Sequence, residues 1–216
     1  GTVDIKDATP EKLSAMMVGR DVNFVVEKKP AKPGEVVLDI KGMTVASKSH
    51  KNNAVNDVSL QVHRGEIVCI AGIDGNGQTE FVYGLSGLEP LKGGTITMNG
   101  KDITHMSIRE RLTSGMSHIP EDRHKHGLVL DYSLEDNIVL QRYFEPEFTN
   151  SLGFLKRKEI REYANGLIEQ YDIRSGQGAV TKARSMSGGN QQKAIVAREI
   201  DKNPELLIAV QPTRGL

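Results

Sequence analysis

One glycine-rich stretch limits the possible folds of this chain more than any other feature. It reads Gly72-Ile73-Asp74-Gly75-Asn76-Gly77-Gln78-Thr79 and follows the apolar run Ile67-Val68-Cys69-Ile70-Ala71. A β-branched apolar run, a glycine loop and an apolar-periodic segment together predict a buried strand, a tight loop and a helix. In that setting, loop N–H groups and the helix N-terminus form a cradle for phosphate. The stretch therefore predicts an α/β fold with a nucleotide site.

Position 78 departs from the pattern G-x-x-x-x-G-K-[ST], because Gln78 stands where the lysine belongs. A lysine carries a charge to the phosphates, whereas an amide offers only neutral hydrogen bonds. A hydrogen bond to a charged group contributes roughly 1.5–3 kcal/mol. The change should therefore weaken triphosphate binding about 10- to 100-fold without abolishing it. A glycine cluster alone can also serve packing, so its meaning depends on the rest of the chain.

Composition limits the class of protein. The 216 residues suit one domain with an extension. Lys plus Arg and Asp plus Glu number 28 each, so bulk charge favours neither nucleic acid nor an anionic membrane surface. The single cysteine, Cys69, excludes an internal disulfide framework. No apolar run approaches the roughly 18 residues of a membrane span. We expect a soluble, cytoplasmic piece of a longer protein.

The chain order suggests a small β subdomain attached to the phosphate-loop core. Residues 1–35 are expected to form a tail and linker, with a short helix capped near Thr9 and Pro10. Strands are expected at 36–40, 58–62 and 94–100, the last with an Asn99-Gly100 turn. A short helix from 107 to 111 and a core strand at 116–119 should follow.

The next part of the chain is polar and then helical. In the loop 120–127, His124 and His126 could ligate a metal, but a solvated or partner-facing loop is favoured because no cysteine or further ligand pair is near in the sequence. Ser133 and Asp136 resemble a capping box. Residues 156–171 predict an amphipathic helix with a core-facing apolar side.

A second anion site is predicted at the Ser-Gly-Gly turn of MSGGNQQK, residues 186–193. The turn opens an apolar-periodic helix (Ala194, Ile195, Ala197, Ile200), so free N–H groups, a hydroxyl and the helix dipole coincide. The strand-like run Leu206–Val210 follows and looks buried.

These motifs together resemble a known family. MSGGNQQK resembles the signature motif of ATP-binding-cassette proteins, and LLIAVQPTRGL resembles their strand of four apolar residues followed by Asp, Glu, Pro and Thr. GIDGNGQTE, IPEDRHKHGLVL and AVQPTRGL resemble the second of two tandem cassettes in bacterial simple-sugar and nucleoside importers. The stretch from His118 to Asn137 is similar to the nucleoside-type, basic-membrane-protein-associated branch.

The resemblance covers the chain from about residue 36 to its end and implies a fold. That fold is a P-loop NTPase of the ABC nucleotide-binding type, with an antiparallel β subdomain and an α-helical signature subdomain at about 121–190, truncated at its C-terminus. Residues 1–35 are similar to the tail of a preceding cassette plus a linker, and 36–216 would form the second cassette.

The resemblance also implies site residues, with ATP and Mg²⁺ as cofactors. Glu121 stands at the position of the family's coupling glutamine, the Q-loop. Val210 and Gln211 replace the metal-binding Asp and the catalytic Glu, so no catalytic carboxylate is intact and this site is degenerate. The implied nucleotide contacts are Gly72, Ile73, Asp74, Gly75, Asn76, Gly77, Gln78, Thr79 and Glu80, with Thr79 as the metal ligand. The signature residues that would serve a partner's ATP are Ser187, Gly188, Gly189, Asn190 and Gln191.

The implied function is transport. The chain would be an ATP-binding domain of a nucleoside or simple-sugar importer, inactive alone and completing the ATP site of the first cassette of the same polypeptide. Its other partners would be membrane permease subunits and, indirectly, a substrate-binding lipoprotein, at the cytoplasmic face of the bacterial membrane and without nucleic acid. Three alternatives stay open: a self-sufficient ATPase, a soluble cassette protein of translation or DNA repair, and a purely structural cassette.

Overall fold

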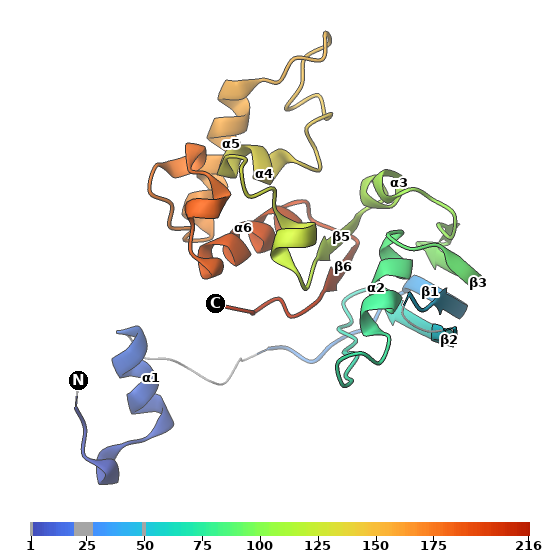
Figure 1. Cartoon of the computed structure of the whole chain (residues 1–216), viewed down its shortest axis with the longest axis horizontal. Coiled ribbons are helices and arrows are strands. Elements are labelled where there is room, and N and C mark those ends of the chain that lie inside the picture. Colours follow the sequence, from blue (N-terminus) through green and yellow to red (C-terminus); the bar gives the residue numbers. More distant parts are fainter. Residues whose placement is uncertain (1, 20–27, 49–50) are drawn as a thin grey trace.

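The structure is a computed structural model that describes residues 2–19, 28–48 and 51–216. Figure 1 shows an antiparallel sheet carrying helix α2, a smaller parallel sheet beside it, and a helical part beyond. The elements in chain order are η1 Ile5–Asp7, α1 Pro10–Val18, β1 Val36–Ala46, β2 Asn53–His63, α2 Gln78–Ser86, β3 Leu91–Met98, β4 Lys101–Asp102, α3 Ile108–Thr113, β5 Met116–Ile119, η2 Arg123–Gly127, α4 Leu134–Val139, α5 Arg157–Gln170, η3 Gly178–Val180, η4 Ala183–Ser185, α6 Gly188–Asp201 and β6 Leu206–Ala209.

The antiparallel sheet has the strand order β2-β1-β3-β4, which confirms the predicted antiparallel β subdomain. The strands β1 and β2 are longer than the predicted strands at 36–40 and 58–62, and register shifts interrupt their pairing. The predicted turn between β3 and β4 is confirmed, since Asn99 and Gly100 both adopt positive φ, as a tight hairpin requires.

Helix α2 is fixed on the sheet by apolar contacts and by one buried guanidinium. Phe81 and Leu85 of α2 belong to the same buried cluster as Met43 of β1. Arg111 of α3 is 3% exposed and donates to the carbonyl oxygens of Gly84 and Leu85, the latter at 2.7 Å. Both carbonyls lie in the last turn of α2, where the usual helical N–H donors are missing, and Gly84 also accepts the N–H of the capping Gly87 at 3.3 Å. Arg111 therefore helps to hold the C-terminal end of this helix in place.

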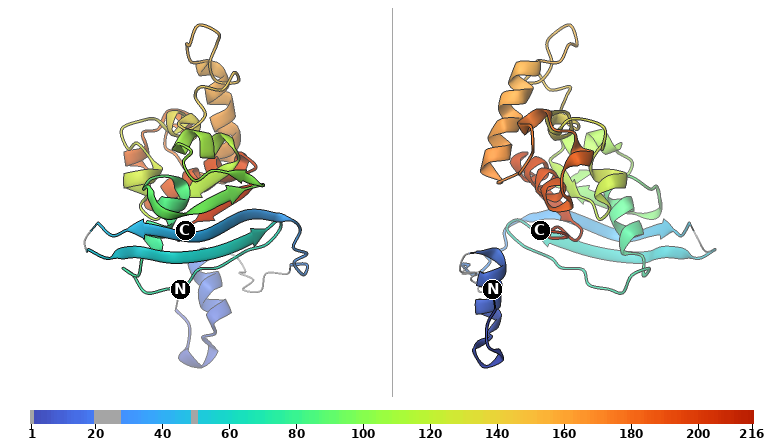
Figure 2. Two further views of the ribbon diagram at one scale, coloured as in Figure 1. Left: turned by 90° about the vertical axis from the view of Figure 1, so that its right-hand side faces the viewer. Right: turned by 60° about the vertical axis from the view of Figure 1, so that its left-hand side comes forward.

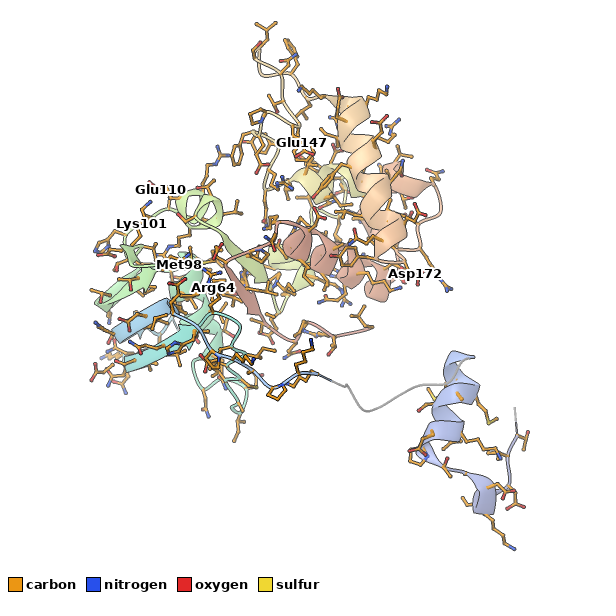
Figure 3. All side chains as sticks on the ribbon, turned by 180° about the vertical axis from the view of Figure 1, so that it is seen from behind. Arg64, Met98, Lys101, Glu110, Glu147 and Asp172 are labelled. Atoms are coloured by element: carbon orange, nitrogen blue, oxygen red, sulfur yellow. The ribbon has the colours of Figure 1, made fainter. Side chains whose placement is uncertain are left out.

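The smaller sheet pairs β5 with β6 in parallel, from Met116 opposite Leu206 to Ile119 opposite Ala209. Met116 and Leu206 join the core under the antiparallel sheet. Arg64, which follows β2 and is labelled in Figure 3, donates to Glu205 at 2.7 Å, just before β6 begins. Because the pair is parallel, the carboxyl ends of both strands meet at one edge.

The helical part has its own core, drawn from α4, α5, η3 and α6. The predicted amphipathic helix is confirmed, since Ile160, Ala164 and Leu167 of α5 are buried. The predicted capping box is confirmed in its first half, because the Ser133 hydroxyl accepts the Asp136 N–H at 3.1 Å. The Asp136 carboxylate accepts the Ser133 hydroxyl at 2.6 Å, in place of the backbone N–H that a capping box uses. The predicted apolar-periodic helix is α6, in which Ala194, Ile195 and Ala197 are buried and Ile200, in the last turn, is 42% exposed.

The run 67–71 is not the buried strand that its sequence predicted. No strand is assigned there, Ile67 is 87% and Ile70 55% exposed, and Cys69 is exposed rather than buried. A strand forms only against a neighbour, and β-branched residues favour it only on a packed, pleated surface. Among the described residues, β5 and β6 pair only with each other, which leaves this run without a ladder. The run Leu206–Val210 forms strand β6, but it is only partly buried as predicted: Leu206 is buried, whereas Leu207 is 39% exposed.

The N-terminal helix α1 lies apart from the sheets and the helical part (Figures 1 and 2). Its predicted start is confirmed, because the Thr9 hydroxyl accepts the Lys12 N–H at 3.2 Å and Pro10 opens the helix. Part of the predicted linker, 20–27, lies outside the described residues. No helix in the described part of the chain has the length and apolarity needed to cross a membrane.

Candidate nucleotide-binding site

The phosphate loop leads into α2 as predicted. Gly77 precedes the helix with φ of 93°, and the first intrahelical bond runs from the Phe81 N–H to the Gly77 oxygen at 2.8 Å. The N–H groups of Gln78, Thr79 and Glu80 therefore have no partner within the helix and are free for an anion. A Cβ at position 77 would lie 2.3 Å from the Ala54 oxygen, so both conformation and space require glycine.

Gln78 folds back over this loop. Its Nε2 donates to the Ile73 oxygen at 3.1 Å and lies 1.9 Å from where a Cβ on Gly72 would stand. The amide therefore sits inside the loop in which phosphate would be held. It offers an N–H there but no positive charge.

A small cavity joins α2 to the carboxyl ends of β5 and β6. Its volume is about 40 Å³, several times the roughly 10–15 Å³ that one water requires. Thr79, Glu121 and Val210 all line it, so the structure brings together three predicted site residues that are far apart in sequence. Of these three, Thr79 and Glu121 offer side-chain oxygen atoms, whereas the valine side chain has none.

Glu121 and Gln211 meet at this edge. The Gln211 Nε2 donates to the Glu121 carboxylate at 3.3 Å, and Arg214 donates to the Glu121 carbonyl oxygen at 3.4 Å. Gln211 has φ of 47°, which is uncommon for a residue other than glycine and marks local backbone strain. The segment is also held by α6, whose Gln192 donates to the Pro212 oxygen at 2.9 Å.

His118 of β5 also lines the cavity, and its Nε2 is buried without a hydrogen-bond partner among the described residues. Burial lowers the pKa of His118 to about 4, against the opposing charge of Glu199. The imidazole is therefore neutral near pH 7. A buried polar atom without a partner usually indicates a water or an ion at the site, so the cavity is suited to a polar occupant.

The signature turn has the geometry of an open helix N-terminus. The Ser187 hydroxyl caps α6, accepting the backbone N–H of Asn190 at 3.4 Å and its side-chain amide at 2.9 Å. The hydroxyl proton of Ser187 and the N–H groups of Gly188 and Gly189 are left for an anion. Gln191 instead turns inward, since it is 5% exposed and donates to the Ala183 oxygen at 2.8 Å.

The polar loop 120–127 is partly solvated, since Asp122, His124 and Lys125 are exposed, and its role in facing a partner stays a prediction. It forms η2, a π-helical turn, whose histidines bond to two helices of the same chain. His126 Nε2 lies 3.0 Å from the Tyr83 hydroxyl of α2, and His124 Nε2 lies 3.0 Å from Gln191 of α6. The loop thus contacts both the phosphate-loop helix and the signature helix. In the described ranges, no three His, Cys, Asp or Glu side chains gather as a metal site.

Sequence reasoning missed Arg123 and Tyr83. Burial raises the pKa of Tyr83, and the negative charge of Glu121 adds to this, which places its hydroxyl in the same electrostatic environment as the cavity. The guanidinium of Arg123 lies against Gly188. The sequence signal was position, since Arg123 lies four residues beyond the end of a core strand, near the edge where functional groups gather in α/β sheets.

The residues present fit a nucleotide with its metal ion. Mg²⁺ prefers oxygen ligands and is usually held by one or two protein groups together with phosphate. The Thr79 hydroxyl and the Glu121 carboxylate belong to residues that line one cavity, and they are such a donor set. The unpaired N–H groups at the start of α2 suit the phosphates.

Comparison with known proteins agrees with this geometry. Residues 55–214 match the family described as ABC transporter. The guanosine import ATP-binding protein NupO of Bacillus subtilis is 50% identical over 215 residues, which is 100% of this chain and 42% of that protein. The nucleoside import ATP-binding protein NupA of Lactococcus lactis is 48% identical, again over 100% of this chain and 42% of that protein. The chain thus spans less than half the length of these relatives.

Solved structures share the fold. The dimeric ATP-binding cassette MJ0796 bound to ADP and Pi has a TM-score of 0.67 and 22% sequence identity, covering 83% of this chain and 75% of that one. At this identity the likeness establishes the fold alone. It confirms the predicted cassette fold, with its antiparallel sheet and its helices.

Proposed function

Because the chain belongs to the ABC transporter family, we propose that it is the second nucleotide-binding domain of a tandem-cassette importer ATPase. It covers 42% of two relatives that are named for guanosine and nucleoside import, as one of two cassettes would. Nucleosides are therefore the favoured solutes, with simple sugars as the second class. In this proposal residues 1–35 are the preceding tail and linker, 36–216 are the cassette, and about 121–190 form its helical subdomain.

The chain's own nucleotide site binds ATP and turns it over poorly. The loop lacks the lysine at Gln78, and strand β6 ends in Val210 and Gln211 without a carboxylate. Loss of a general base typically costs about 10²- to 10⁴-fold in rate. Thr79 and Glu121 would hold Mg²⁺ beside the phosphates, and the ion, when bound, neutralises their charge.

The signature turn contributes to ATP hydrolysis by completing the ATP site of the first cassette. The observation that carries this proposal is the asymmetry between the two motifs. The hydrolytic carboxylates are absent from β6, whereas Ser187, Gly188 and Gly189 keep an open, capped helix N-terminus. Such an end binds phosphate through its N–H groups and its dipole.

The remaining partners follow from the importer role. Membrane permease subunits would bind the cassette pair at the cytoplasmic face of the membrane, and a substrate-binding lipoprotein would act on the outer side. ATP hydrolysis by the complete protein would energise uptake. Nucleic acid has no place in this assignment.

The test is Ser187→Asp in the full-length protein. Aspartate caps a helix as well as serine does, so α6 should remain folded. Its negative charge, however, lies where the partner's phosphate must bind. We expect ATP hydrolysis to fall about 100-fold or more, as when a preorganised anion donor is lost.

The matched control is Ser185→Asp, which makes the same chemical change at an exposed serine two residues away. It should hydrolyse ATP nearly as the wild type does. The proposal is wrong if Ser187→Asp keeps full activity, or if both variants lose activity equally.

A further inference from the structure

Arg123 lies at the first turn of the signature helix. It opens η2, four residues after the last residue of β5, and its side chain reaches across to α6. A Cβ on Gly188 would stand 2.7 Å from Arg123 Nη2 and 3.2 Å from its Cζ, and a Cβ on Gly215 would stand 3.6 Å from Nη1. The guanidinium therefore fills the space between the first residue of α6 and the segment that follows β6.

This guanidinium has no counter-charge in the described part of the chain. Its Nε is buried without a hydrogen-bond partner, and no ion pair forms with any described carboxylate. The nearest carboxylate in sequence, Asp122, accepts the N–H groups of His124 and Lys125 instead. Other arginines of the fold are bonded to carboxylates or carbonyls: Arg111, Arg142, Arg161, Arg184 and Arg198.

The placement is electrostatically unfavourable as it stands. The N-terminus of a helix carries roughly half a positive charge, which favours anions and disfavours cations. Arg123 adds a full positive charge beside the N–H groups of Gly188 and Gly189, which themselves have no intrahelical partner. Two positive groups with unsatisfied donors, side by side, are stabilised together by one shared anion. A planar guanidinium matches phosphate oxygens particularly well.

We propose that Arg123 binds phosphate at the signature site, together with Ser187 and the first turn of α6. The anion is the terminal phosphate of a nucleoside triphosphate that the first cassette presents. The inference deepens the proposed function and rests on it, because it requires the signature turn to face a nucleotide held by another cassette. It adds a charged residue to a site that is otherwise built from a hydroxyl and backbone N–H groups.

The experiment compares Arg123→Gln and Arg123→Lys with Lys125→Gln in the full-length protein. Lys125 is an exposed lysine of the same turn, so its variant removes the same charge from the same loop. We expect Arg123→Gln to lower kcat/KM for ATP hydrolysis about 10- to 100-fold, the value of one charged hydrogen bond. Arg123→Lys keeps the charge and should lose less, and Lys125→Gln should change little.

A second readout separates binding from folding. If Arg123 awaits an anion, its removal relieves repulsion in the nucleotide-free protein. The midpoint of thermal unfolding of Arg123→Gln without nucleotide should then stay level or rise by about 1–3 °C. A structural arginine would lower it. Trapping of ADP with orthovanadate should fall in parallel with hydrolysis.

The outcomes distinguish this inference from the proposed function. If Ser187→Asp abolishes hydrolysis but Arg123→Gln hydrolyses ATP like the wild type, Arg123 takes no part and only this inference fails. If Arg123→Gln loses thermal stability or does not fold, and Arg123→Lys also melts lower, the residue is structural and the inference is equally overturned. If Ser187→Asp is fully active, the proposed function itself fails.

Discussion

At the scale of single residues, His118 shows how burial fixes a protonation state. Its backbone N–H donates to Glu199 at 3.3 Å, and Glu199, His126 and Lys202 are the ionisable groups that act on its ring. Burial outweighs the attraction of Glu199 and lowers the pKa of His118 from 6.5 to about 4. The folded protein therefore resists a proton that the unfolded chain accepts.

The sign of the pH effect follows from this difference. Below pH 6.5 the unfolded state binds a proton at His118 and the folded state does not until about pH 4, so stability falls as the pH falls through that window. At pH 4.5, this difference in proton binding lowers the free energy of unfolding by about 2–3 kcal/mol relative to pH 7. We predict that the free energy of unfolding of the wild type drops between pH 7 and pH 4.5 by about that much more than that of His118→Gln.

Denaturant unfolding at the two pH values measures this difference. His105→Gln, which removes a histidine at an exposed position, is the control and should follow the wild type. Parallel behaviour of the wild type and His118→Gln would show that His118 is protonated as readily in the folded state as in the unfolded one.

At the scale of elements, the parallel pairing of β5 and β6 decides which residues meet. The register places Ile119 opposite Ala209, so Glu121 and Gln211 extend from the same edge and bond at 3.3 Å. In the proposed assignment, Glu121 puts a carboxylate at the position of the family's Q-loop amide, and Gln211 puts an amide at the position of its catalytic carboxylate. The exchange keeps one carboxylate at this edge but moves it from one strand to its neighbour.

This exchange predicts that Glu121→Gln has opposite effects on ATP binding with and without Mg²⁺. With Mg²⁺ present, Glu121→Gln should weaken ATP binding at this chain's loop about 10-fold, because a ligand of the ion is lost. In excess EDTA the same variant should bind ATP about 3- to 10-fold more tightly, because a negative charge near the phosphates is removed. The double variant Glu121→Gln with Gln211→Glu should behave like the wild type again.

Photolabelling with azido-ATP, read on peptides of this chain, measures binding at the right site of the full-length protein. Glu205→Gln removes a carboxylate at the opposite end of β6, and it should leave ATP binding unchanged both with Mg²⁺ and in EDTA. Weaker binding of Glu121→Gln both with and without Mg²⁺ would indicate a purely structural role for the Glu121–Gln211 bond.

How far the sequence predicted these elements depends on how local their causes are. The Asn99-Gly100 turn and the Ser133 cap arise within a few residues, and both were predicted correctly. The run 67–71 was predicted wrongly, because a strand depends on a neighbour that its own residues do not specify. The meeting of Glu121 with Gln211 was not predicted either, because it requires the register of two strands far apart in sequence.

At the scale of the whole molecule, one chain carries two helix N-termini that open on glycine turns, and in the proposed function these two ends face different nucleotides. Helix α2 lies on the antiparallel sheet and α6 lies with the helical part, with β5 and β6 between them (Figures 1 and 2). The turn η2 contacts both helices through His126 and His124. The fold thus keeps the two ends in a fixed relation while their chemistry differs.

This division of labour predicts that binding and turnover at the chain's own loop can be separated. In Gln78→Lys, the new ammonium takes the place of an amide that lies across Gly72 and restores a point charge to the phosphates. ATP binding at this loop should tighten about 10- to 100-fold. Hydrolysis by the full-length protein should stay near the wild-type rate, because Val210 and Gln211 still supply no carboxylate and the productive ATP lies at the signature turn.

Azido-ATP labelling of this chain's peptides reports the first effect and steady-state phosphate release the second. Gln61→Lys, which adds the same charge to β2 rather than to the loop, is the control for bulk electrostatics and should alter neither. A rise in hydrolysis in Gln78→Lys that Ser187→Asp does not suppress would mean that this loop turns over its own nucleotide. The difference between the phosphate loop and the signature turn would then reflect weak ATP binding at the loop, and the two sites would not have separate roles.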